Sequence, residues 1–230
     1  MKMKFTKFTL IIPALIISAA ATAQNQTYIN SSGYISGNMI VPRKAASQPA
    51  SGSQYYNDKF MPAKVDNSSE ILVVRHNAYS DEMEVKVLEE IKVLQPVLGQ
   101  TVSVVGTDTT YEYVQYTNED NVLNQHYLMV ISDNPNLKIY KRQEIYLQPE
   151  QHPTGGYQKY KAAMYKEKDP KYYIKVKDGK IVHFEPNKSE IIGLFPEKKN
   201  EIKDFLKENK ISPKDEEDLP KLGAYLSTLL

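Results

Sequence analysis

No cysteine occurs among the 230 residues of this chain. Its absence excludes a disulfide framework, a thiolate nucleophile and a lipid anchor attached through cysteine. Tryptophan is absent too, which weakens a sugar-binding interpretation, because its large amphipathic ring suits such platforms. Arginine is scarce: the 29 Lys and Arg residues include only Arg43, Arg75 and Arg142. Sites in which arginine guanidinium groups bind phosphate or carboxylate in a bidentate manner are therefore less favoured.

A strong net charge and long apolar runs are also missing. The formal charge is +1, whereas nucleic-acid-binding proteins carry a basic face, so no nucleic-acid partner is expected. The one extended apolar run, Leu10–Ala21, is shorter than the ~20 residues of a membrane span. It follows three lysines and runs into the small-x-small triplet Ala21-Thr22-Ala23. We therefore predict a signal peptide over residues 1–23, cleaved after Ala23, and an exported protein, periplasmic or extracellular, without a transmembrane segment in its mature chain.

What the chain does contain predicts β-structure. Residues 24–54 are rich in Ser, Asn, Gly and Pro, which predicts a mostly irregular segment with room for one edge strand near Tyr34–Val41. The stretch Ile71–Val87 then reads as two strands that meet at a polar turn. Its second arm alternates strictly between an apolar face and a face predicted to be solvated, formed by Glu82, Glu84 and Lys86.

Strand-length segments separated by turn residues continue to residue 185. The clearest signal is Asp178-Gly179, which joins two alternating runs as a two-residue hairpin loop. From Pro186 the apolar period changes from two to about 3.6 and predicts helices over residues 186–230. Pro220 inside the last run kinks that helix or delays its start. We predict an α+β fold: a curved antiparallel β-sheet or partial barrel over residues 55–185, followed by two to three C-terminal helices packed on it.

Three segments carry a resemblance to known proteins. They are YNDKFMPAKV at Tyr56–Val65, VVRHNAYSDEMEVK at Val73–Lys86 and FPEKKNEIKDFLKENK at Phe195–Lys210. With these segments, most of the chain after residue 51 resembles a family of exported Bacteroidota proteins that has no assigned function. The resemblance implies an envelope location and a β-domain followed by a helical tail. It carries over no catalytic residue.

Candidate residues for catalysis or metal binding are few. His76, His126 and His183 lie in predicted strands and are weak metal-ligand candidates, because none has a close ligand spacing such as His-Glu-x-x-His. Each is otherwise a half-buried or surface histidine. The sequence contains no P-loop, no GxGxxG motif and no Gly-x-Ser-x-Gly elbow. We therefore predict no cofactor, no metal and no catalytic residue.

Tyrosine is the most unusual component, with 17 residues. Tyr111, Tyr113, Tyr116 and Tyr127 lie on predicted strands, where exposed rings would form a binding platform. The alternative is that they fill the rim of a β-core. Separately, Asp108-Thr109-Thr110 resembles the short Asp-Ser/Thr-x acceptor for O-glycosylation in exported proteins of the same lineage, which makes Thr109 a candidate modification site.

Three hypotheses for function follow. The first is a non-enzymatic binding or assembly module of the cell envelope that acts through a tyrosine-rich sheet face, with another envelope protein as its partner. The second is a carrier of a lipid or other apolar small molecule, with its cavity between the sheet and the C-terminal helices. The third is a hydrolase whose site is assembled from distant strands and leaves no motif in the linear sequence.

Overall fold

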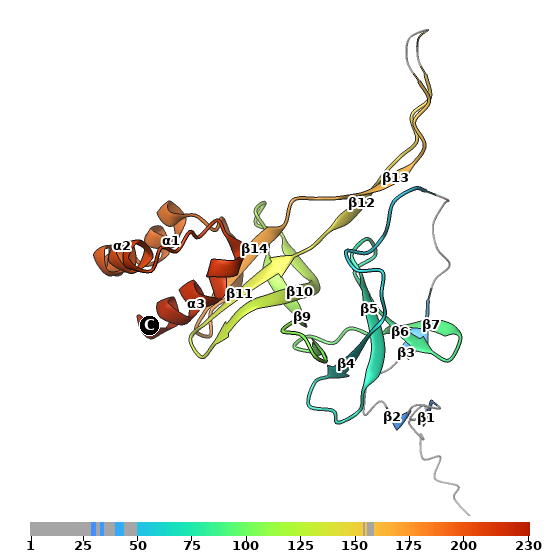
Figure 1. The fold of residues 1–230 in the computed structure, drawn as a ribbon, viewed down its shortest axis with the longest axis horizontal. Coiled ribbons are helices and arrows are strands. Elements are labelled where there is room, and N and C mark those ends of the chain that lie inside the picture. The colour runs from blue at the N-terminus through green and yellow to red at the C-terminus, as the bar shows by residue number, and fades with distance from the viewer. Residues whose placement is uncertain (1–28, 31–32, 35–39, 44–49, 154, 156–158) are drawn as a thin grey trace, which may run out of the picture.

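The molecule is an α+β protein that is mostly β-structure, with three helices at its C-terminal end (Figure 1). This computed structural model describes residues 29–30, 33–34, 40–43, 50–153, 155 and 159–230. The predicted signal peptide lies outside the described residues. Within the described ranges, no helix is long and apolar enough to cross a membrane.

Within the described residues, the strands form one large sheet and two small ones. In chain order they are β1 (Ile29–Asn30), β2 (Gly33–Tyr34), β3 (Ile40–Pro42), β4 (Met61–Val65), β5 (Leu72–Asn77), β6 (Glu82–Val87), β7 (Glu90–Leu94), β8 (Thr101–Val104), β9 (Thr110–Thr117), β10 (Leu123–Asn134), β11 (Leu137–Arg142), β12 (Ile145–Gln148), β13 (Met164–Glu167), β14 (Lys171–Val176) and β15 (Ile181–Phe184). The first three lie within the segment predicted to be irregular. The hairpin predicted at Asp178-Gly179 forms between β14 and β15.

Five strands of the large sheet close into a barrel, in the order β10, β11, β14, β15 and β9, with β9 returning to β10. The long strand β10 makes this closure possible, because its first half pairs with β9 and its second half with β11. A register shift between Val130 and Ser132 marks the change, and such bulges bend a strand. The pairing of β15 with β9 is parallel, so the barrel is mixed rather than purely antiparallel.

The rest of the large sheet is a wing that continues from β9 through β8, β4, β5, β6, β7 and β3. Strands β9 and β10 belong to both the barrel and the wing. Because successive side chains of a strand point to opposite faces, one face of these strands packs into the barrel core and the other into the core of the wing. Val114, Tyr116 and Leu128 point into the barrel cluster. Tyr111 and Tyr127 point into the cluster that covers the wing. The two cores therefore share a wall only one strand layer thick.

The helices cover the outer face of the barrel near β10, β11 and β14 (Figure 1). They are α1 (Lys188–Leu194), α2 (Lys199–Glu208) and α3 (Leu219–Thr228). Asn187 is the N-cap residue of α1, and its side chain accepts a hydrogen bond from the backbone nitrogen of Glu190. Pro220 lies in the first turn of α3, so it delays the start of that helix instead of kinking it. Apolar side chains from helices and barrel pack together in one cluster.

Burial of tyrosines inside these cores predicts sensitivity to alkali. Burial raises the pKa of Tyr111 from 10.0 to about 12, and it raises the pKa values of Tyr127, Tyr140 and Tyr173 as well. Because the neutral forms are favoured in the folded state, their stabilising contribution is complete below pH 10 and declines as pH rises above it.

We expect tyrosinate absorbance to appear in two phases, with the later phase coinciding with loss of near-ultraviolet circular dichroism. A Tyr111→Phe variant should lose one residue's amplitude from the later phase. Ionisation of all tyrosines in a single phase near pH 10, with the fold intact, would contradict the assignment.

Candidate functional site

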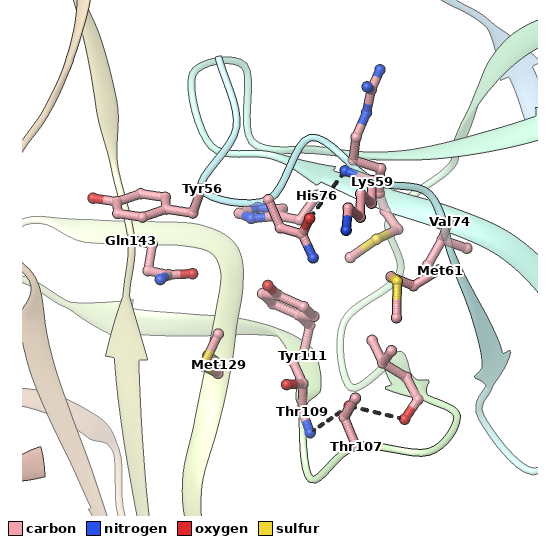
Figure 2. Close-up of a pocket in the computed structure, with 14 residues that line it drawn as sticks. Tyr56, Lys59, Met61, Val74, His76, Thr107, Thr109, Tyr111, Met129 and Gln143 are labelled. Atoms are coloured by element: carbon pink, nitrogen blue, oxygen red, sulfur yellow. Dashed lines mark hydrogen bonds between the residues drawn. The ribbon is translucent and has the colours of Figure 1, made fainter. Parts of the chain in front are cut away.

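The strongest candidate site is a pocket of about 270 Å³ between the wing and the β9–β10 wall (Figure 2). Five strands of the wing and its wall, β4, β5, β6, β8 and β9, together with β10, contribute lining residues. The segment before β4 and the turn between β8 and β9 form its rim. The lining residues are Tyr56, Asn57, Lys59, Met61, Val74, Arg75, His76, Met83, Val104, Thr107, Thr109, Tyr111, Met129 and Gln143.

Both walls of the pocket carry apolar side chains, because strand register brings methionine and valine onto the faces that line it. Met61 is directly opposite Val74 across β4 and β5. Met83 is opposite His76 across β5 and β6, and it is fully buried. Met129 pairs with Tyr111 on the far wall. Methionine side chains are flexible and polarisable, and they adapt to ligands of different shape.

Polar groups lie beside these apolar side chains, around the ring of Tyr111. The Tyr111 ring lies 5.0 Å from the imidazole of His76, centroid to centroid. Its hydroxyl points into the pocket (Figure 2). His76 is 5% exposed, and its Nε2 lies 3.3 Å from Oδ1 of Asp81. Gln143 lies on the same side (Figure 2). The pocket therefore offers hydrogen-bonding groups beside an apolar wall.

Behind this wall, on the opposite face of β5 and β6, lies a buried polar group that we call the Glu84 cluster. Its members are Arg43, Gln54, Tyr55, Arg75, Asn77 and Glu84. Glu84 is fully buried, so the solvated position predicted from strand alternation is wrong for this residue. Side chains of β6 do alternate between its two faces as predicted. The face that carries Glu84 is buried because residues that precede β4 in the chain cover it.

The contacts of Glu84 account for its burial. Nη2 of Arg75 lies 2.7 Å from Oε2, and Nη2 of Arg43 lies 3.2 Å from Oε1. The hydroxyl of Tyr55 donates to the same carboxylate at 3.0 Å, and burial together with the charge of Glu84 raises the pKa of Tyr55. The amide of Asn77 donates to Oε1 at 3.0 Å. A buried carboxylate is tolerated when cations and donors satisfy it in this way.

The four tyrosines predicted to form a binding platform have different positions. Tyr116 and Tyr127 are each 2% exposed, so they cannot present their rings to a partner and belong to the two cores. Tyr113 is half-buried and packs edge-on against Tyr127 at 5.0 Å. Only Tyr111 lines the pocket. For Tyr116 and Tyr127 the exposed platform is therefore wrong, because their strands are covered on both faces.

The three histidines considered as metal-ligand candidates occupy separate surroundings. His76 lies in the pocket, whereas Nδ1 of His126 lies 2.8 Å from the hydroxyl of Tyr116. Arg142 contacts both of those groups, and burial lowers the pKa of His126. His183 packs 5.7 Å from the ring of Tyr173. Among the described residues, no group of three or more His, Cys, Asp or Glu side chains is placed to hold a metal ion.

Thr109, the candidate glycosylation site, lies at the mouth of the pocket. It is half-buried, and its backbone nitrogen donates to Oγ1 of Thr107 at 3.1 Å. Modification of Thr109 remains a prediction.

Sequence reasoning did not identify Lys59, Met61, Met83, Met129 or Gln143 as parts of one site. These residues are far apart in the chain, and only strand pairing brings them together. The one available signal was the alternation around Met83, which indicates an inward-facing residue but does not indicate a cavity beside it.

Comparisons of the chain with protein-family models, with curated proteins and with solved structures found no match. The interpretation of the pocket therefore depends on the geometry and chemistry of its own residues.

Proposed function

We propose that this chain is an exported, non-enzymatic binding protein whose ligand is a small, partly apolar molecule held in the pocket. The observation that supports the proposal most directly is a cavity of about 270 Å³ into which the hydroxyl of Tyr111 points (Figure 2). Sites for small molecules are usually concave and preformed, with apolar walls and a few placed polar groups. The volume lies just below the usual range for such sites, which favours a small ligand.

The proposal joins the first two sequence hypotheses and changes the location of the site. Binding through an open tyrosine face is replaced by binding around Tyr111, because Tyr116 and Tyr127 are buried. A cavity between the sheet and the C-terminal helices is not proposed, because apolar side chains pack together there. Export to the periplasm or the cell exterior, and membership of the Bacteroidota family named above, remain parts of the proposal. The predicted leader and the resemblance support them.

Titration with N-phenyl-1-naphthylamine, a neutral fluorescent probe of apolar sites, tests this function. We expect saturable fluorescence enhancement with one site per chain. A Thr109→Tyr variant fills the mouth of the pocket and should weaken probe binding at least tenfold. A Val122→Tyr variant is the control, because Val122 is 51% exposed on the turn between β9 and β10. It should bind like the parent protein.

A second blocking variant, Met61→Phe, enlarges a lining side chain on β4. The test then does not depend on correct folding of the Thr109→Tyr variant. Circular dichroism and thermal unfolding should show that each variant is folded. Probe binding that does not saturate, or that is unchanged in both blocking variants, would overturn the proposed function.

A further inference from the structure

We infer that the ligand is an apolar carboxylate, a small aliphatic or aromatic acid whose anionic group lies beside Lys59 and whose hydrocarbon part lies among the methionines. The inference rests on the proposed function and adds the chemical class of its ligand. Its first support is the composition of the lining, which includes the cations Lys59 and Arg75 and no aspartate or glutamate.

Of the two permanent cations in the lining, only Lys59 is available to a ligand. Arg75 belongs to the opposite face of β5, where its guanidinium pairs with Glu84 and lies 3.7 Å over the ring of Tyr55. Lys59 forms no ion pair with any described residue. Its backbone nitrogen donates to Oδ1 of Asn57 at 3.0 Å, which holds the rim segment in place (Figure 2). The pocket therefore has one uncommitted positive charge at its edge.

The acids beside the lining in sequence do not line the pocket. Glu84, Glu112 and Glu144 pair with Arg75, Lys138 and Lys168. The carboxylate of Asp58 accepts a hydrogen bond from Ser53 at 2.6 Å. Asp81 contacts His76 and also accepts from the backbone nitrogen of Tyr127 at 3.2 Å. Asp108 is exposed on the turn between the two lining threonines. Of Asp58, Asp81 and Asp108, only Asp108 has no such contact among the described residues, and it faces solvent.

A single carboxylate suits this site better than a phosphate group. One lysine supplies a point charge, whereas phosphate recognition usually recruits the planar fork of arginine, which is committed to Glu84 here. The hydroxyl of Tyr111 adds a donor for the second carboxylate oxygen. The apolar remainder of the ligand then meets the side chains of Met61 and Met129, which are both partly exposed.

Competition against the naphthylamine probe tests the ligand class with three compounds of similar shape: 3-phenylpropanoate, its neutral amide and 3-phenylpropylamine. We expect the acid to bind at least tenfold more tightly than the amide, and the amine most weakly, because a hydrogen-bonded charge contributes more than a neutral group. Lys59→Met should abolish the preference for the acid. Lys64→Met, at an exposed position of β4 outside the lining, makes the same charge change and should retain it.

The outcomes separate the two proposals. Equal binding of acid and amide, or an unchanged preference in Lys59→Met, would overturn the carboxylate inference while probe binding leaves the proposed function intact. Absence of saturable binding by the probe and by all three compounds would overturn both. Since Lys59 is exposed, added salt should weaken the acid more than the amide. A second variant, Lys59→Gln, should reproduce the loss of preference if Met at this position affects the rim.

Discussion

A Glu84→Gln variant is expected to lose about 3 kcal/mol of unfolding free energy, which is the lower end of the range for breaking a buried ion pair. The carboxylate is fully buried and balances two arginines, so its neutral replacement leaves both cations without an anion. The lower end applies because the side chains of Arg43 and Arg75 are 20% and 13% exposed and regain some hydration. Urea unfolding at neutral pH measures the difference.

Glu90→Gln is the matched control. Glu90 lies on the neighbouring strand β7, its side chain is 74% exposed, and its pair with Lys92 spans 3.4 Å. Exposed pairs of this kind contribute little, so the change should stay within about 0.5 kcal/mol. A loss below about 1 kcal/mol in Glu84→Gln would show that the Glu84 cluster does not hold the covering segment to the sheet.

The Glu84 cluster also links stability to the proposed function. Gln54 and Tyr55 belong to the cluster, and the same segment continues to Asn57 and Lys59 at the rim of the pocket. Loss of the carboxylate should therefore increase amide hydrogen exchange in residues 53–59 more than in β9 and β10. The rim would be held less firmly, although no pocket residue is changed.

The fold was largely predictable because periodicity is a local property. Alternation located the hairpin of β5 and β6, the Asp178-Gly179 turn identified β14 and β15, and the change of period at Pro186 identified the helices. Barrel closure was not predictable in the same way. It depends on the parallel pairing of β15 with β9 and on the divided pairing of β10, which join segments distant in sequence.

The candidate site was less predictable, because burial on a strand's second face depends on what covers it. Glu84 alternates like a solvated residue, and only the arginines and Tyr55 brought over it explain its burial. Tyr116 and Tyr127 are likewise of a residue type that suits an exposed binding platform. They are buried because β9 and β10 have a core on each face. Tyr111 was singled out as a binding residue, yet the pocket around it arises from long-range strand pairing.

The docking of α3 on the barrel gives the other large expected effect, at Gly223. A β-carbon at Gly223 would overlap Oγ of Ser132 and lie 2.8 Å from its Cβ, with Cδ1 of Ile139 at 3.3 Å. In an unobstructed helix, replacing glycine by alanine stabilises by about 1 kcal/mol. Here we expect the opposite sign: Gly223→Ala should lower the unfolding free energy by about 2 kcal/mol, because the helix must move away from β10.

Gly193 in α1 provides the matched comparison, since a β-carbon there would meet no atom within 4 Å. Gly193→Ala should therefore stabilise by up to about 1 kcal/mol. Combining Gly223→Ala with Ser132→Gly removes both of the closest atoms, so the alanine should destabilise much less in that background than in the parent. Ser132 follows the register shift of β10, and that bend brings it under the helix. An equal effect of Gly223→Ala in both backgrounds would show that close packing against Ser132 does not set the position of α3.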